Sequence, residues 1–591
     1  MKKRQEIEEE YKWDLSLLCS GKEEFYQKVN KINDFLPKIK AFEGKLNNKE
    51  DILAYLKLNE QFSKFVEPLA LYAHLKSAEV LSDSERQEMS EKLSNILNNI
   101  SVESSFASSE LNKLSNEALD DIISDKRFKD YDRTFENIKR NKKHTLSKAE
   151  EKLLSGMNFL SGFSSNMDML SDVDMKFGNI KDSKGKLHAL THSSYSSLVR
   201  SGDRKLRMLA FKKMNGTYGN YINTLSNNYI SDVKADCYFA KVRKYKSALD
   251  RELEGEEIDK KVYTTLVKQV ENNLDLLFDY FEVKGKLLGL KKLYIYDTLA
   301  DVGKISNKKY TYDEAIEIIK KAVSPLGEEY VSLIQRAKDE RWIDVYPNQD
   351  KSSGAFETAI YGYHPYVMTN FEGDLDDIFT LAHELGHAMH SYFSDKTQAY
   401  PKSQYPIFLA EIASTTNEML LINYLLKIAT SKEEKIALYN KLFDEVKGTI
   451  YRQTMFAEFE EKVHKVCEDG EPLTKDILCG LYYILNKKYF GPVKLIDEIR
   501  YEWARIPHFF NAFYVFKYAT GLVSAITFAN KILSGEEGAL ENYIKFLSSG
   551  CSQNPVKILK DCGCDLTSEK TFTTCFDYLY KMLDDFKKLA K

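Results

Sequence analysis

Residues 53–62 read LAYLKLNEQF, and their apolar side chains recur at intervals of three and four residues. This spacing places the apolar groups on one face of an α-helix. The same pattern dominates residues 23–174 with few prolines to interrupt it, so we expect antiparallel helices there. The fold class that follows is mainly α.

Residues 175–192, MKFGNIKDSKGKLHALTH, interrupt the helical pattern. Short alternating runs flank the turn-forming cluster DSKG at 182–185, which predicts a β-hairpin. We place a domain boundary near Gly202. Residues 1–202 are then an N-terminal helical domain that contains the hairpin, and residues 203–591 form a second domain.

Helical periodicity resumes over residues 204–289. Two strand-like pieces, around 342–346 and 355–371, are rich in aromatic and β-forming residues and predict a small β-sheet. From residue 375 onward the sequence again has the spacing of helices, interrupted by single prolines and glycines. The small sheet should therefore lie next to the helix that begins at residue 375.

The charge balance of the chain excludes some classes of protein. Its 591 residues include 85 Lys and Arg against 89 Asp and Glu, a formal net charge of −4, which argues against a protein that binds nucleic acid by neutralising phosphates. Residues 1–19 run into a cluster of glutamates instead of an apolar signal sequence, and no stretch has the roughly 18 apolar residues of a membrane span. Eight cysteines are too sparse for a disulfide scaffold, so we expect a cytoplasmic protein with reduced thiols.

Residues 381–390, LAHELGHAMH, contain the HExxH pattern. On a helix, positions i and i+4 lie about 40° apart around the axis, so His383 and His387 can reach one metal ion. Zinc in such a site polarises a water molecule, and Glu384 is placed beside it to act as the base. The alternative is a helix whose histidines bind no metal.

A catalytic zinc needs a third protein ligand, which leaves its fourth position for water or substrate. Glu411 lies 24 residues after His387 (411 − 387 = 24), in an apolar helix that begins near Phe408. A carboxylate on an interior helix face needs a compensating charge, and zinc supplies it. We therefore predict one Zn²⁺ per chain, held by His383, His387 and Glu411, with a solvent-exposed Glu411 as the alternative.

Two further residues lie near these ligands in the sequence. His390 is about 10 Å along the helix from His383, too far for both to bind one ion, so we expect it in the core or behind the ligands. Glu418 is seven residues after Glu411 and shares its helix face. It either accepts a hydrogen bond from a ligand imidazole or forms a structural salt bridge.

Residues 505–521, RIPHFFNAFYVFKYATG, place Tyr514 and Tyr518 four residues apart, on one helix face, after His508. By itself this aromatic stripe is typical of a packed core. In a peptidase, however, hydrolysis builds negative charge on the former carbonyl oxygen, and neutral hydrogen-bond donors aimed at that oxygen stabilise the transition state. Tyr hydroxyls and a His N–H are suitable donors.

At this point the chain resembles the thimet oligopeptidase and oligoendopeptidase F family of zinc metallopeptidases, and the oligoendopeptidase F branch in particular. The resemblance follows most of the chain in order. It is carried by YKWDLS (11–16), the hairpin region, SGDRKLRMLAF (201–211), WIDVYPNQDKSSGAF (342–356), YHPYVMTNFEGDLDDIFTLAHELGHAMHSYFS (363–394), AEIASTTNE (410–418) and RIPHFFNAFYVFKYATG (505–521).

The resemblance implies a closed, mainly helical bowl with zinc at the bottom of a deep channel that admits unstructured oligopeptides and excludes folded proteins. It implies that His383, His387 and Glu411 bind zinc, that Glu384 is the base, and that the N-terminal domain forms walls of the channel. Residues 203–591 are then the zinc metallopeptidase domain.

The resemblance also implies roles for residues outside the metal site. His508, Tyr514 and Tyr518 match the groups that stabilise the tetrahedral intermediate, although Phe510 and Phe513 stand where relatives carry Tyr. Residues 355–371 resemble an edge strand that holds a peptide backbone by β-addition. Gly354 would allow close approach there, and His364 and Tyr366 would contact substrate. Cys564 departs from the expected aliphatic residue and lies far from the motif.

We therefore expect a zinc-dependent endopeptidase whose partners are oligopeptide substrates, with no nucleic acid and no membrane. One alternative is a zinc carboxypeptidase that shares HExxH and a distant glutamate. Another is a non-catalytic peptide-binding protein with a structural zinc, although structural sites commonly use four protein ligands including cysteine. The sequence does not predict whether the chain is a monomer or a small homo-oligomer.

Overall fold

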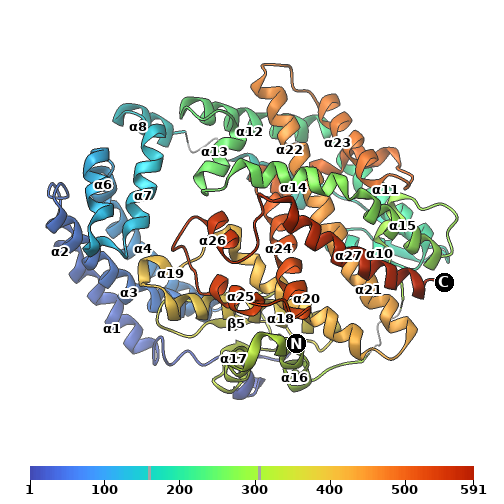
Figure 1. Ribbon diagram of the computed structural model, residues 1–591, viewed down its shortest axis with the longest axis horizontal. Coiled ribbons are helices and arrows are strands. Elements are labelled where there is room, and N and C mark those ends of the chain that lie inside the picture. The colour runs from blue at the N-terminus through green and yellow to red at the C-terminus, as the bar shows by residue number, and fades with distance from the viewer. Residues whose placement is uncertain (158–161, 304–307) are drawn as a thin grey trace. The chain divides into compact units, whose positions relative to one another are not determined.

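A computed structural model of the protein describes residues 1–157, 162–303 and 308–591. Helices dominate the described residues (Figure 1), which confirms the mainly α fold class. The helix expected to run through residues 158–161 falls outside the described part of the chain. Among the described residues, no helix combines the length and the apolar character that a bilayer crossing requires.

The chain groups into two compact units, and each unit is built from three separate segments. Unit 1 comprises Met1–Lys143, Asn307–Tyr424 and Lys531–Gly563. Unit 2 comprises His144–Ser306, Leu425–Asn530 and Cys564–Lys591. The domain boundary near Gly202 and the closed bowl with its channel stay predictions.

The N-terminal helices of unit 1 share one apolar core. The fully buried Phe25, Leu69 and Phe128 come from three different helices of this region and belong to the same cluster. The α-helices of unit 1 are α1 (Lys22–Ile32), α2 (Leu36–Lys40), α3 (Lys49–Glu79), α4 (Ser84–Ser104), α5 (Phe106–Leu111), α6 (Asn116–Ser124), α7 (Asp132–Asn141), α16 (Tyr312–Ala322), α17 (Gly327–Asp339), α18 (Leu375–Thr397), α19 (Tyr400–Ser403), α20 (Ile407–Ile428, which runs past the end of the segment), α25 (Ala539–Leu547) and α26 (Pro555–Asp561).

The small sheet of unit 1 has three short strands in the order β3-β5-β4. β3 (Ile343–Asp344) pairs in parallel with β5 (Tyr366–Met368), and β4 (Phe356–Thr358) pairs with β5 in antiparallel orientation. Both β4 and β5 contact α18, as expected for a sheet beside this helix. The piece expected over 355–371 is two strands, because Gly362 at φ 84° turns the chain between them.

The helix that carries the HExxH pattern, α18, has a defined start. Gly373 at φ 87° ends the preceding extended segment, and the Asp374 side chain accepts a hydrogen bond from the Asp377 N–H at the first turn. Its buried face packs on the sheet and on α25, where the ring of Phe546 lies 5.0 Å from that of His390. The helix that carries the candidate metal-binding histidines therefore packs against the sheet and a helix of the same unit.

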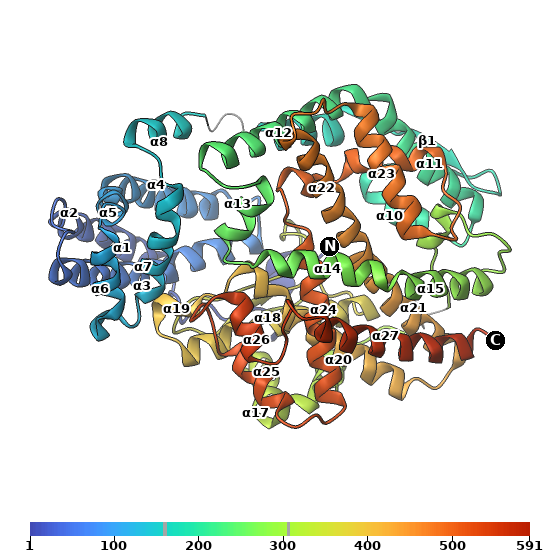
Figure 2. The same cartoon turned by 45° about the horizontal axis from the view of Figure 1, so that its top comes forward.

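Unit 2 contains the hairpin expected from the sequence, with β1 (Asn179–Lys181) and β2 (Leu187–Ala189) paired in antiparallel orientation. The helices α12 (Ile222–Val242), α22 (Arg452–Glu468) and α23 (Lys475–Phe490) contact one another, and Figure 2 shows α22 and α23 next to each other. The α-helices of unit 2 are α8 (Lys148–Ser155), α9 (Phe163–Asp168), α10 (His192–Arg200), α11 (Arg204–Asn220), α12 (Ile222–Val242), α13 (Ala248–Gly255), α14 (Lys260–Asn272), α15 (Leu274–Leu287), α21 (Lys432–Val446), α22 (Arg452–Glu468), α23 (Lys475–Phe490), α24 (Phe516–Leu533, which runs past the end of the segment) and α27 (Glu569–Leu589).

A buried ion network joins two helices of unit 2. The Lys284 ammonium on α15 has no exposed surface and donates to Asp444 Oδ1 at 2.9 Å and to Oδ2 at 3.0 Å. Lys447 also donates to the Asp444 carboxylate and to the Thr298 carbonyl. Burial first, and then the neighbouring Lys447, lower the pKa of Lys284 to about 7. The Asp444 carboxylate therefore compensates the positive charge of both buried lysines in this part of the core.

Candidate metal centre

His383 and His387 lie one turn apart on α18 and face the same side of the helix. Their Nε2 atoms are 3.2 Å apart, and their ring centroids are 4.9 Å apart. This is the arrangement that the i, i+4 spacing predicts for two imidazoles that share one ion.

The third donor comes from the neighbouring helix α20. Glu411 Oε2 lies 3.4 Å from His383 Nε2 and 3.7 Å from His387 Nε2. A tetrahedral zinc with bonds of about 2.0–2.1 Å separates its ligand atoms by about 3.3 Å. The two imidazoles and the carboxylate therefore fit a single divalent ion, and among the described residues they form the one cluster of this kind.

Gly386, between the two histidines, sets the distance between α18 and α20. A Cβ atom built on Gly386 would lie 2.5 Å from Ser414 Cα and 2.8 Å from the Ala413 carbonyl oxygen, closer than real Cβ contacts. The close approach is also fixed by a hydrogen bond from Asn417 Nδ2 to the Ala382 carbonyl oxygen at 3.0 Å. This role was not predicted from the sequence, although a glycine between two candidate ligands is a signal for close approach of another backbone.

Groups on α20 orient both histidines through hydrogen bonds to their rings. His383 Nδ1 is hydrogen-bonded to Glu418 Oε1, and the ring of His387 is hydrogen-bonded to the backbone of Ala410. Metal-binding histidines usually donate their second ring N–H in this way, which fixes the tautomer and the ring orientation. Of the two roles considered for Glu418, the hydrogen bond to an imidazole of the candidate metal site is the one that the structure shows.

The electrostatics of the site are dominated by Glu411 and Glu418. Burial acts to lower the pKa of His383, but hydrogen bonds and charge from these two carboxylates outweigh it and raise this pKa to about 10. The pKa of His387 is lowered by burial and by the neighbouring His383. A cation bound by the imidazoles must therefore displace a proton from His383, which links metal affinity to pH.

Glu384 follows His383 on the same buried stretch of α18 and is only 8% exposed. Burial raises the pKa of its carboxyl to about 7, with the carboxylates of Glu411 and Glu418 adding to the effect. The protein thus keeps a largely desolvated carboxyl group directly beside the metal-binding cluster.

His390 takes no part in the metal-binding cluster. Its ring is fully buried and stacks on the ring of Tyr405 at a centroid distance of 3.7 Å. Neither ring nitrogen has a hydrogen-bond partner among the described residues. The expectation of a core histidine is confirmed.

The candidate transition-state residues His508, Tyr514 and Tyr518 belong to unit 2, where the structure groups them together. The ring of Tyr518 lies 6.0 Å from that of His508 and 5.3 Å from that of Tyr514. His508 is exposed and the two tyrosines are half-buried, so all three present surface to solvent. Their role in catalysis stays a prediction.

The three substrate-binding candidates lie around the sheet of unit 1. Gly354 precedes β4 with φ 79°, a backbone conformation that favours glycine. The His364 ring stacks on the Trp342 ring at 5.0 Å and lies 4.4 Å from the tilted ring of Tyr366. Tyr366 is fully buried on the central strand β5, within the apolar core. Substrate contact by these residues also stays a prediction.

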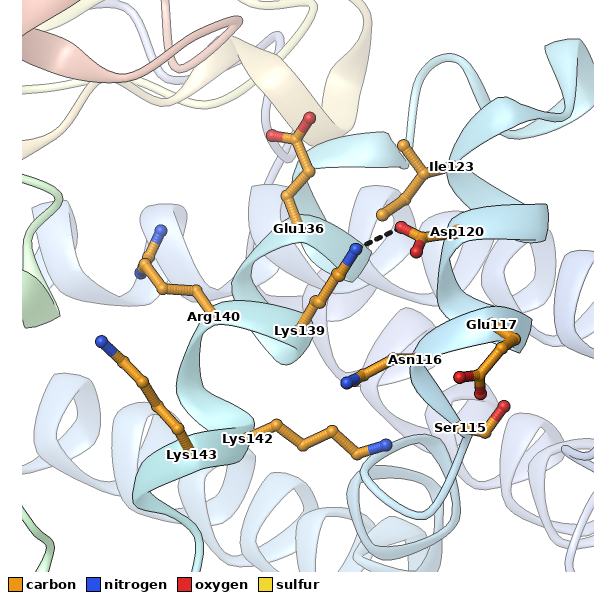
Figure 3. Close-up of a pocket in the computed structure, with 10 residues that line it drawn as sticks. All are labelled: Ser115, Asn116, Glu117, Asp120, Ile123, Glu136, Lys139, Arg140, Lys142 and Lys143. Atoms are coloured by element: carbon orange, nitrogen blue, oxygen red, sulfur yellow. Dashed lines mark hydrogen bonds and ion pairs between the residues drawn. The ribbon is translucent and has the colours of Figure 1, made fainter.

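A separate surface pocket lies between α6 and α7 of unit 1 (Figure 3). Its charged groups are largely engaged with the protein itself, since Lys139 pairs with Asp120 and Lys142 donates to the Leu114 carbonyl. The residues that line it are Ser115, Asn116, Glu117, Asp120, Ile123, Glu136, Lys139, Arg140, Lys142 and Lys143. None of the metal-binding residues or catalytic candidates lines this pocket.

Comparisons with known proteins agree with this geometry. Residues 197–577 match peptidase family M3, and residues 110–177 match the family described as Oligopeptidase F. Oligopeptidase PepF of Bacillus subtilis (strain 168) is 36% identical over 590 residues, covering 99% of this chain and 88% of the relative. An oligoendopeptidase F homolog of Borreliella burgdorferi is 36% identical and covers 99% of both chains. The crystal structure of oligoendopeptidase-F from Enterococcus faecium has a TM-score of 0.73 at 31% identity and covers 96% of this chain and 99% of that chain.

Proposed function

The chain belongs to peptidase family M3, a family of metal-dependent peptidases, and on this premise we propose that it is a zinc-dependent oligoendopeptidase. It hydrolyses internal bonds of short, unstructured peptides. The observation that carries the proposal is the cluster of His383, His387 and Glu411 with the buried Glu384 beside it. The names of the relatives, oligopeptidase and oligoendopeptidase F, support the substrate class and the internal position of the cut.

His383, His387 and Glu411 would hold one zinc ion per chain. Imidazole nitrogens favour zinc and its neighbours in the first transition series over magnesium or calcium. When bound, zinc acts as a Lewis acid that makes water acidic enough to lose a proton near neutral pH. Three protein ligands leave the fourth position open, which is typical of a catalytic rather than a structural site.

The protein's own groups carry the proton transfers. Glu384 accepts a proton from the attacking water and delivers it to the amine that leaves, so one carboxyl group serves as base and then as acid. His508, Tyr514 and Tyr518 donate hydrogen bonds to the oxygen that gains negative charge, which is worth several kcal/mol in a desolvated site.

The edge of the small sheet is the proposed docking line for the peptide backbone. β4 pairs with β5 on one side only among the described residues, so its other side offers backbone N–H and C=O groups for β-addition. An unstructured peptide has unpaired backbone groups and can form such a strand, whereas the strands of a folded protein are already paired within it. Gly354, two residues before β4, would let the peptide approach the backbone closely.

All eight cysteines lie in the described part of the chain, and none of them forms a disulfide there. This state suits the reducing cytoplasm, where we place the enzyme and its peptide substrates. Neither zinc ligation nor the proposed chemistry uses a cysteine.

An internally quenched peptide blocked at both ends tests the proposal. We expect the zinc-loaded protein to cut it, a chelator to abolish cutting, and added zinc to restore it. A carboxypeptidase needs a free C-terminus and would leave the blocked peptide intact, and a binding protein would leave every peptide intact. Failure to cut any blocked peptide in the zinc-loaded state would therefore refute the assignment as an endopeptidase.

The variant Glu384→Gln tests the role of the base. We expect it to keep its zinc content and its fold and to lose at least about 100-fold in kcat, the range that general-base catalysis supplies. Glu329→Gln is the matched control, because this exposed glutamate pairs with Lys396 at the surface. Full activity in Glu384→Gln would refute the mechanism.

A further inference from the structure

The loop between His508 and Tyr514 makes a tight turn at residues 511–514. The Tyr514 N–H donates to the Asn511 carbonyl oxygen at 3.2 Å, which closes a four-residue turn. Phe513, the third residue of this turn, has φ 57°. Turns with a positive φ at that position normally carry glycine or asparagine.

Phe513 holds this conformation against the preference of its side chain. L-residues other than glycine rarely adopt positive φ, and such backbone outliers gather at functional sites where the surroundings enforce them. The surroundings here are specific, because the Phe513 ring is 1% exposed and lies 4.7 Å from the ring of His464. Packing alone, however, does not determine which way the backbone of residue 513 points.

A hydrogen bond to Glu460 fixes the direction of the Phe513 N–H. This residue lies on α22, has no exposed surface, and accepts a hydrogen bond from the Phe513 N–H on its Oε1 at 3.0 Å. Its other oxygen, Oε2, is buried and has no hydrogen-bond partner among the described residues. Burial raises the pKa of Glu460 well above its usual range. A buried carboxyl group kept for a single backbone contact is costly in a structural role alone.

Buried anchors and candidate catalytic groups alternate along this loop. Phe509 is buried against Phe456, Phe459 and the ring of Tyr229, whereas the preceding His508 is exposed. Phe513 is buried on α22, whereas the following Tyr514 is half-buried. Phe509, before the turn, and Phe513, within it, therefore anchor the backbone next to His508 and Tyr514, whose side chains keep surface exposed to solvent.

We propose that Glu460 is a positioning residue for peptide hydrolysis: its Oε1 fixes the Phe513 N–H, and the turn at 511–514 then holds Tyr514 and His508 in the geometry that the reaction requires. This inference rests on the proposed function, in which these two side chains stabilise the transition state. Glu460 itself touches neither substrate nor metal in this account. Its effect passes entirely through the backbone of the turn.

Two substitutions at position 460 separate geometry from charge. Glu460→Gln keeps a carbonyl oxygen in the place of Oε1, so we expect kcat within about threefold of wild type. Glu460→Met keeps the side-chain length and removes the acceptor. We expect kcat to fall by about 10- to 100-fold with KM within about threefold, because misplacement of a group that acts in the transition state lowers kcat and kcat/KM together.

Thr454→Val on the same helix is the matched control. Thr454 is fully buried, and its hydroxyl donates to the Ile450 carbonyl oxygen, so the variant also loses a buried hydrogen bond of α22. We expect it to lose stability and to keep kcat. If Glu460→Met has the same kcat as Thr454→Val, or if Glu460→Gln falls as far as Glu460→Met, the proposal is overturned.

Hydrogen exchange provides a readout that does not depend on activity. The Phe513 amide should exchange slowly in the wild type and in Glu460→Gln, and at least tenfold faster in Glu460→Met, measured by mass spectrometry on a fragment that spans the turn. Unchanged exchange in Glu460→Met overturns the proposal whatever the kinetics are. A zinc-loaded wild type that cuts no peptide overturns the proposed function instead, and the exchange rates then decide by themselves whether Glu460 holds the turn.

Discussion

The variant Gly386→Ala should separate metal binding from folding. Gly386 lies between the two metal-binding histidines, where α18 and α20 come closest, and an added Cβ would lie 2.5 Å from Ser414 Cα. Ordinary van der Waals contact begins at 3.4 Å, so the two helix backbones must separate by about 0.9 Å to admit one methyl group. This displacement moves Glu411 away from both imidazoles.

The effect on stability should be small because two terms oppose each other. Alanine is favoured over glycine in a helix interior by about 1 kcal/mol, whereas overpacking of a buried contact costs about 1–3 kcal/mol. We therefore expect metal-free Gly386→Ala to lose only about 0–2 kcal/mol of unfolding free energy. Metal sites tolerate deviations of only about 0.2 Å in their bonds, so a shift of Glu411 by about 0.9 Å should weaken zinc binding by more than about 100-fold.

The assay is a zinc titration against a chromophoric chelator, paired with chemical denaturation of the metal-free protein. Gly480→Ala is the control, because Gly480 lies within α23 and an added Cβ there meets nothing within 4 Å. That variant should bind zinc as the wild type does and gain up to about 1 kcal/mol. Wild-type zinc affinity in Gly386→Ala would show that α20 moves away from α18 without displacing Glu411. That result would refute the proposed link between helix spacing and zinc affinity.

Three further predictions test the surroundings of the site and the core. Glu418→Ala should lower zinc affinity by about 10–100-fold in the same titration, because it removes the carboxylate that orients a ligand imidazole, and an unchanged affinity would contradict that role. Asp444→Asn should lose about 3–5 kcal/mol of unfolding free energy by denaturation, since Lys284 and Lys447 remain buried without their carboxylate, and a loss below about 1 kcal/mol would refute the network's importance. Burial raises the pKa of Glu357 to about 8, so between pH 4.5 and 8 the unfolded state ionises first and stability falls as pH rises. Glu357→Gln should remove this loss, so its gain over wild type should grow from below about 1 kcal/mol at pH 5 to about 4 kcal/mol near pH 8, whereas parallel stability profiles would contradict it.

Local patterns in the sequence were enough to predict most of the helices and strands and the three side chains that the structure brings together as candidate metal ligands. The i, i+4 relation of His383 and His387 depends only on helix geometry, so it survives folding unchanged. Glu411 was found because a carboxylate among apolar neighbours needs a partner charge, although no local rule states which helix it faces. The structure brings it to within 3.7 Å of both imidazoles.

Other features depend on contacts between distant segments and could not be predicted from spacing. The expected strand over 355–371 is two strands, because the turn at Gly362 follows from pairing with β5 and not from composition. The role of Gly386 becomes visible only when α20 is in place against it. The contact between Glu460 and Phe513 joins residues 53 positions apart and involves a backbone N–H, which has no sequence signature.

The interleaved segments of the two units have a consequence for how the protein is made. Unit 1 includes Lys531–Gly563, and α25 within that segment packs on α18. The helix that bears the histidines therefore leaves the ribosome more than a hundred residues before one of its packing partners is synthesised. Contacts this distant in sequence slow folding. A nascent chain that has passed Glu411 but stops short of residue 563 holds all three candidate metal ligands on an incomplete unit. Because each unit is built from three separate segments, neither unit corresponds to a continuous fragment of the gene.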